Sequence, residues 1–148
     1  MSTKIDMYGH SRGGMQTFLA LKQLPTIKAV ASISGASDVL RSLDVRPAME
    51  KVYNFRIPNY ATKKVAELEK RSVLKWADKF DKTIPILLQH GEQDSKLSVE
   101  NSKWLARALT KLKHPHKRST YEGEGHSWHP KTEPIVMKER TDCFHQHL

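Results

Sequence analysis

The chain has 148 residues, of which 38% are hydrophobic and 28% are charged. This length and balance predict one globular domain with a buried core and exclude a disordered chain. The formal net charge is +9, but Lys and Arg are scattered and do not interleave with aromatic residues, so no specific nucleic-acid binding is expected.

No apolar run reaches the roughly eighteen residues that a membrane span requires. The first residues lack the apolar segment of a signal peptide. The single cysteine, Cys143, excludes an internal disulfide. These features favour a cytoplasmic protein without membrane association.

The first third of the chain predicts a β-α-β unit. Residues 5–8 form a short apolar strand, and residues 15–24 have the apolar spacing of a helix that ends at Pro25. Residues 28–34 form a second, almost entirely apolar or small strand. Such strands are typical of a parallel sheet that is covered on both faces.

The middle of the chain, residues 36–82, is polar and predicted to be helical, with breaks at Pro47 and Pro58. Its best helix is expected at residues 63–80. The apolar positions of that helix are expected to be Val65, Leu68, Val73, Trp76, Ala77 and Phe80.

The last part adds a strand at residues 85–90, an amphipathic helix at 98–112 that Ser98 can cap, a strand at 117–121 and a closing helix at 133–148. This order predicts an α/β fold over residues 1–148, with a mostly parallel sheet of about four strands flanked by helices. No internal repeat or linker divides the chain.

A G-x-S-x-G motif runs from Gly9 through His10, Ser11 and Arg12 to Gly13. Because a strand precedes it and a helix follows, the motif predicts a nucleophile elbow, with glycines flanking Ser11 where a sharp turn leaves no room for side chains. The backbone N–H of Arg12 is expected to face a developing oxyanion at the helix N-terminus. An ordinary glycine-rich turn is the alternative.

A serine requires a base at neutral pH, and in this kind of sheet the acid and the base follow the serine on later loops. Asp94 follows the third predicted strand and lies 83 residues after Ser11. His126 follows the fourth predicted strand and lies 32 residues after Asp94. We predict that His126 takes the proton of Ser11 and that Asp94 orients His126. Glu92 competes with Asp94 for the role of the acid. His90 lies at a strand end, where it can have a purely structural role.

A metal site is not expected. His129 lies three residues after His126, so the two could form a pair of ligands, but no Asp, Glu or Cys at ligand spacing completes a metal site with them. Cys143, His145 and His147 form a C-x-H-x-H run on the closing helix, where they need not point together.

Four segments resemble the catalytic domain of the prolyl oligopeptidase family of serine peptidases, an α/β-hydrolase branch. The resemblance extends from about residue 4 to residue 148. The segments are residues 9–14 (GHSRGG), 71–77 (RSVLKWA), 85–94 (PILLQHGEQD) and 121–126 (YEGEGH).

The resemblance implies hydrolysis of short peptides, esters or acyl-amino compounds through an acyl-enzyme on Ser11, without a cofactor. Peptidase and esterase activity both remain open. The alternative is a catalytically weak or silent remnant that acts as a binding or assembly module.

In that family several strands precede the nucleophile elbow, where this chain has about eight residues. The chain is therefore expected to be the C-terminal half of a catalytic domain, without a second oxyanion donor and with low turnover. The strand that holds Ile5 and Tyr8 should then form a sheet edge. We expect that edge to pair in a homodimer, or with a partner that supplies the missing N-terminal half.

Overall fold

The computed structural model describes residues 5–146. It confirms the α/β fold: four strands form one parallel sheet in the order β1-β2-β3-β4. The strands are β1 (Ile5–His10), β2 (Ile27–Ile33), β3 (Ile86–Gly91) and β4 (His116–Tyr121). Because every pairing is parallel, the carboxyl ends of all four strands meet at one edge of the sheet.

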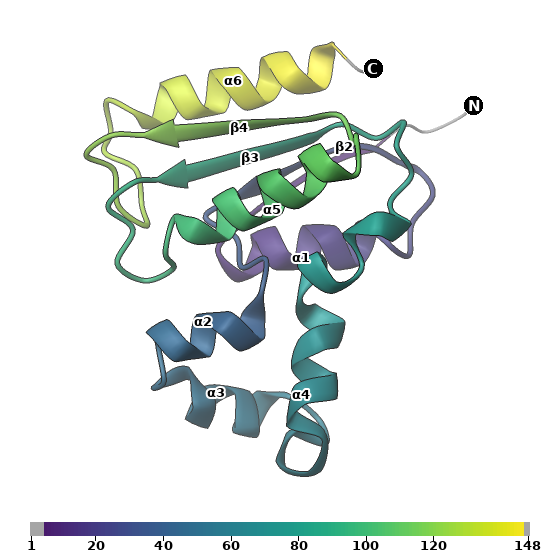
Figure 1. The fold of residues 1–148 in the computed structure, drawn as a ribbon. Coiled ribbons are helices and arrows are strands. Elements are labelled where there is room, and N and C mark those ends of the chain that lie inside the picture. The colour runs from purple at the N-terminus through teal and green to yellow at the C-terminus, as the bar shows by residue number, and fades with distance from the viewer. Residues whose placement is uncertain (1–4, 147–148) are drawn as a thin grey trace.

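Three helices cover the sheet (Figure 1). Helix α1 (Arg12–Leu21) packs on β1 and β2, and α5 (Glu100–Lys111) packs on β3 and β4 from the same side. Helix α6 (Glu133–His145) covers the opposite face, where it contacts β2 and β3. Residues 147 and 148, which were expected to complete this last helix, lie outside the described residues.

Three further helices between β2 and β3 form a separate lobe below α1 in Figure 1. They are α2 (Val39–Val45), α3 (Met49–Arg56) and α4 (Tyr60–Arg71). The lobe has its own apolar cluster, made of Ala36, Val39, Leu43, Ile57, Tyr60 and Leu68.

The single helix expected at residues 63–80 is wrong, because the chain leaves the helix at Ser72. The backbone of Ser72 is extended (φ −96°, ψ 100°). Its buried hydroxyl donates to the carbonyl of Leu68 at 2.8 Å and accepts from the N–H of Val39 at 2.9 Å. Serine hydroxyls compete with helical backbone bonds in this way. Two 3-10 turns follow, η1 (Val73–Lys75) and η2 (Ala77–Lys79).

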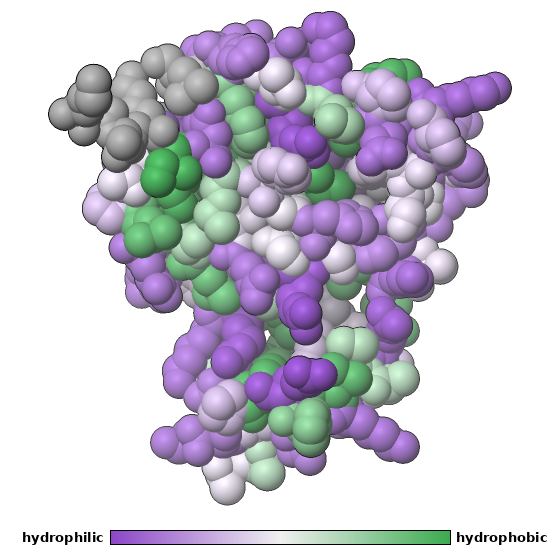
Figure 2. All heavy atoms as spheres, turned by 180° about the vertical axis from the view of Figure 1, so that it is seen from behind, coloured by the Kyte–Doolittle hydropathy of each residue, from purple (hydrophilic) through white to green (hydrophobic). Residues whose placement is uncertain are grey.

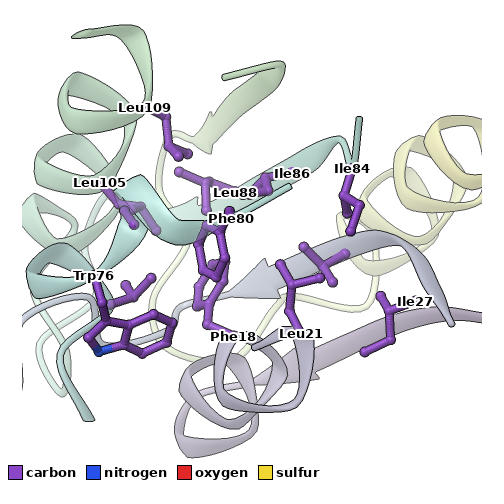
Figure 3. Packing of buried hydrophobic residues seen from close by; sticks show 13 residues of the cluster. Phe18, Leu21, Ile27, Trp76, Phe80, Ile84, Ile86, Leu88, Leu105 and Leu109 are labelled. Carbon is purple, nitrogen blue, oxygen red and sulfur yellow. The ribbon is translucent and has the colours of Figure 1, made fainter. Parts of the chain in front are cut away.

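The main core lies between the sheet, α1, α5 and these turns (Figure 3). The rings of Phe18 and Trp76 pack against Phe80, with centroids 6.0 and 5.5 Å away. Of the apolar positions predicted for residues 63–80, Leu68, Val73, Trp76, Ala77 and Phe80 are buried. Val65 is 54% exposed, so its prediction as a core residue was wrong.

Two helix starts also differ from the prediction. Helix α1 begins at Arg12, immediately after the predicted elbow, and not near residue 15. Helix α5 begins at Glu100, and the hydroxyl of Ser98 accepts from the N–H of Glu100 at 3.3 Å. Within residues 5–146, no helix is long and apolar enough to cross a membrane.

A partly buried carboxylate attaches α6 to the sheet. Glu139 accepts hydrogen bonds from Ser119 (2.5 Å), Gln89 (3.0 Å) and the hydroxyl of Tyr121, and pairs with Lys117 (2.7 Å). Burial opposes ionisation of Glu139, but these donors outweigh it and lower its pKa to about 2. The side chain is therefore a carboxylate at any physiological pH.

Replacing Glu139 by Gln should lower the free energy of unfolding by about 2 kcal/mol at pH 7, because charged hydrogen bonds are lost. The pKa of Glu139 is lower in the folded state, so its stabilisation is present above the ordinary pKa and disappears as the pH falls through about 2. Denaturant titrations should therefore show the E139Q deficit shrinking below about pH 4.5. Asp142→Asn, in an exposed pair with Lys138, should cost less than about 0.5 kcal/mol. Equal effects of both substitutions would contradict this account.

Strand β1 lies at the edge of the described sheet, with β2 on one side only. Ile5 and Tyr8 on it are 46% and 57% exposed. Ile5 and Ser11 donate their N–H groups to the carbonyls of Thr26 and Ile33, on the β2 side. Since alternate residues of a strand point their N–H groups to opposite sides, that of Tyr8 faces outward.

We propose that two copies of this chain pair through the β1 edge, giving a continuous sheet of about eight strands. Sedimentation at micromolar concentration should then detect a dimer. Tyr8→Pro, which removes an outward N–H and leaves the β2 side intact, should shift the chain to monomer with its circular dichroism unchanged. A folded wild-type monomer at these concentrations would refute the pairing.

Candidate active site

Ser11 occupies the turn between β1 and α1 that the G-x-S-x-G motif predicts. Its backbone has φ 58° and ψ −119°, a conformation that costs energy for a residue with a side chain. Its N–H donates to the carbonyl of Ile33 on β2 at 2.8 Å. The turn thus holds Ser11 at the carboxyl edge of the sheet, where α1 begins with Arg12.

Close backbone packing requires two glycines around this turn. A Cβ on Gly9 would lie 2.2 Å from the carbonyl oxygen of Gly13, and one on Gly14 would lie 2.6 Å from the hydroxyl of Ser32. By contrast, a Cβ on Gly13 would meet no atom within 4 Å. Crowding therefore explains why positions 9 and 14 are glycine, whereas the prediction that Gly13 is crowded was wrong.

The structure brings the three predicted site residues into one hydrogen-bonded line. Nε2 of His126 lies 2.9 Å from Oγ of Ser11, and Nδ1 lies 2.7 Å from Oδ2 of Asp94. Asp94 follows β3 and His126 follows β4, as the sequence predicted. The side chain of Asp94 is fully buried, and that of His126 is 13% exposed.

The partners of His126 determine where its proton lies. An ionised carboxylate can only accept, so Nδ1 of His126 carries the proton that is shared with Asp94. Nε2 is then free to accept the hydroxyl proton of Ser11. This is the arrangement that a general base requires.

Asp94 is held as a carboxylate despite its burial. Burial is the largest influence on its pKa and raises it, but hydrogen bonds outweigh that effect. The donors are His90, the backbone of Leu97 and His126, and the net result is a pKa well below the ordinary range. The N–H groups of Lys96 and Leu97 reach Oδ1 at 2.9 and 2.8 Å.

Two histidines support this line in ways that sequence reasoning missed. Nε2 of His90 lies 2.8 Å from the carbonyl of Leu97 and 3.3 Å from Oδ2 of Asp94, so it carries a proton and donates to both. Nε2 of His10 donates to the carbonyl of His126 at 2.6 Å. The sequence places His10 only in the turn, because nothing in its local pattern indicates a partner 116 residues away.

The loops that carry Asp94 and His126 are joined directly. The N–H of Gln93 donates to the carbonyl of Glu124 at 2.9 Å. Gly91 makes this approach possible, since a Cβ there would lie 2.2 Å from the carbonyl oxygen of Gly125. The acid and the base are therefore positioned by one shared backbone contact.

The competing assignments do not converge on this site. Glu92 accepts from the hydroxyl of Thr120 at 2.7 Å, and His129 pairs with Glu124 at 3.0 Å. Across residues 5–146, His, Cys, Asp and Glu side chains form no group of three or more that could hold a metal. His147 of the C-x-H-x-H run lies outside the described residues.

A pocket of about 520 Å³ opens beside Ser11 and His126. One wall comes from the start of α1 (Met15, Leu19) and another from the α2–α3 region of the lobe (Val39, Met49, Tyr53). The space-filling view in Figure 2, from behind, shows a narrow waist between the main body and the lobe, and hydrophobic and hydrophilic residues are intermixed on the lobe. The pocket volume suits a small-molecule or short-peptide ligand.

Comparison with known proteins extends these observations. The profile of the prolyl oligopeptidase family matches residues 1–148. The uncharacterized peptidase YtmA of Bacillus subtilis (strain 168) is 27% identical over 143 residues, which are 93% of this chain and 53% of YtmA. The chain thus spans about half the length of that curated relative.

Solved structures show the same arrangement of elements. A Mycobacterium tuberculosis puromycin-hydrolyzing peptidase is 30% identical with a TM-score of 0.72, over 86% of this chain and 19% of that one. An acylaminoacyl peptidase of Pyrococcus horikoshii is 22% identical with a TM-score of 0.81, over 100% of this chain and 24% of that one. The second of these shows the fold alone. From the family profile, which covers its whole length, we conclude that this chain belongs to the prolyl oligopeptidase family.

Proposed function

We propose that the chain carries the catalytic centre of a serine hydrolase that cleaves short peptides or related acyl compounds through an acyl-enzyme on Ser11. The observation that supports this most strongly is the hydrogen-bonded line from Ser11 through His126 to the buried Asp94. The line ends beside a pocket of suitable size. Membership in a peptidase family supports the same reaction class.

The geometry supports a defined sequence of proton transfers. Oγ of Ser11 attacks the substrate carbonyl carbon while its proton passes to Nε2 of His126. Asp94 stabilises the imidazolium that forms. When the tetrahedral intermediate collapses, His126 gives this proton to the leaving amine or alcohol, and water then releases the acyl group by the reverse path.

The developing oxyanion requires hydrogen-bond donors. Arg12 is the first residue of α1, so its N–H lies at a helix N-terminus and is our candidate for the first donor. A second donor is not assigned among the described residues. Losing one such donor typically costs a factor of about 100 to 1,000 in rate, so we expect slow turnover by this chain alone.

A fluorophosphonate probe should label Ser11, because the probe needs only an activated serine and not a complete substrate pocket. Labelling should be absent from Ser11→Ala and should persist in Ser127→Ala, which removes an exposed serine next to His126. Mass spectrometry of the labelled peptide identifies the site. An unlabelled, folded wild-type chain would argue for a catalytically silent binding module.

Asp94→Asn should slow the labelling of Ser11 by a factor on the order of 1,000 or more, because an amide facing Nδ1 favours the wrong tautomer of His126. Glu92→Gln provides the matched control. Glu92 was the competing acid in the sequence, but its carboxylate bonds to Thr120. Comparable losses in D94N and E92Q would refute the assignment of Asp94.

A further inference from the structure

The pocket beside Ser11 is lined by positive side chains and by no carboxylate. Five of its lining residues carry a cationic group, and Asp and Glu are absent from the lining. The cationic residues are Arg12, Arg46, Arg56, Arg71 and Lys96. They come from five separate elements of the chain, so the fold brings their charges together.

One of these charges is already neutralised. Nη1 of Arg71 lies 2.9 Å from Oε2 of Glu67, whose side chain is only 8% exposed. The other four cations form no ion pair with a carboxylate of residues 5–146. Among the residues that line the pocket, cationic side chains therefore outnumber carboxylates.

Two of the residues that carry these unpaired cations are in direct contact. Arg46 follows the C-terminus of α2, and Lys96 lies on the loop that also carries Asp94. Nη1 of Arg46 donates to the carbonyl of Lys96 at 3.3 Å. This contact connects the lobe to the Asp94 loop, and both residues line the pocket. Arg12, adjacent to Ser11 in the chain, adds a third charge at the reacting end.

The remaining lining is largely apolar. Aliphatic and aromatic side chains from α1, the lobe and α5 complete the walls, among them Leu19, Val52, Ile57, Leu97 and Trp104. A ligand that matches this pocket combines an apolar part with a negative group. Arg side chains bind carboxylates with two parallel hydrogen bonds, which gives direction as well as charge.

We propose that the pocket selects substrates in which a carboxylate, such as an acidic side chain, accompanies an apolar side chain next to the scissile carbonyl. Arg46 and Lys96 determine this preference, with Arg12 contributing near Ser11. The inference rests on the proposed hydrolase function and assigns a substrate class to the same site.

The overall charge of +9 would also attract any anion, so the experiment must separate local from global electrostatics. Lys51 allows this. It is an exposed residue of α3 outside the pocket lining, and Lys51→Gln changes the net charge as much as Arg46→Gln does.

Isothermal titration should compare acetyl-Leu-Glu-amide with acetyl-Leu-Gln-amide, which differ only in one charge. On the full chain with Ser11→Ala, the Glu peptide should bind about tenfold more tightly, and 1 M salt should remove most of that difference. Arg46→Gln and Lys96→Gln, each made singly, should each reduce the ratio to about threefold, whereas Lys51→Gln, which removes one charge as they do, should leave it unchanged. Circular dichroism verifies that each variant is folded.

Equal binding of the two peptides, no binding of either, or the same loss in K51Q would overturn the inference. Labelling of Ser11 by a neutral fluorophosphonate, measured in parallel on the wild-type chain, tests the hydrolase function separately. Labelling without charge preference refutes only the substrate class. Charge preference without labelling refutes the hydrolase function and leaves an anion-selective pocket.

Discussion

A carboxylate that is completely buried and still ionised is the constraint on which the site depends. Transferring a lone charge into a protein interior is very costly, so the charge of Asp94 must be met by donors that are already in place. The donors are the N–H groups of Lys96 and Leu97, the ring of His90 and the ring of His126. Three of these donors come from β3 and the turn after it, and His126 adds the fourth from the loop after β4.

On the side of Ser11, glycine residues allow the close backbone packing that positions the serine. Gly9, Gly14 and Gly35 let the backbones of β1, α1 and the end of β2 approach within distances that any Cβ would prevent. That approach brings the N-terminus of α1 directly to the end of β1, and Ser11 accepts a costly backbone conformation there. The position of its hydroxyl relative to His126 is thus a consequence of helix-to-sheet packing.

The hydrogen-bonded line and the facing pocket wall come from different parts of the fold. The sheet edge supplies Ser11, Asp94 and His126, each after a strand of the main core. The lobe, with its own apolar cluster, supplies most of the wall that faces them. Within the lobe, the hydroxyl of Ser72 joins the C-terminal end of α4 to the start of α2. The lobe can therefore vary its lining residues without altering the positions of the reacting groups.

The sequence by itself determined the α/β class, the four strands and the residues Ser11, Asp94 and His126, because strand periodicity and turn chemistry are local properties. Only the tertiary structure decided that α4 ends before Ser72, that Val65 is exposed and that Gly13 is uncrowded. It likewise decided that His10 and His90 contact the residues of the hydrogen-bonded line and that cations from five elements share one pocket. These features depend on contacts between residues far apart in the chain, which no local pattern encodes.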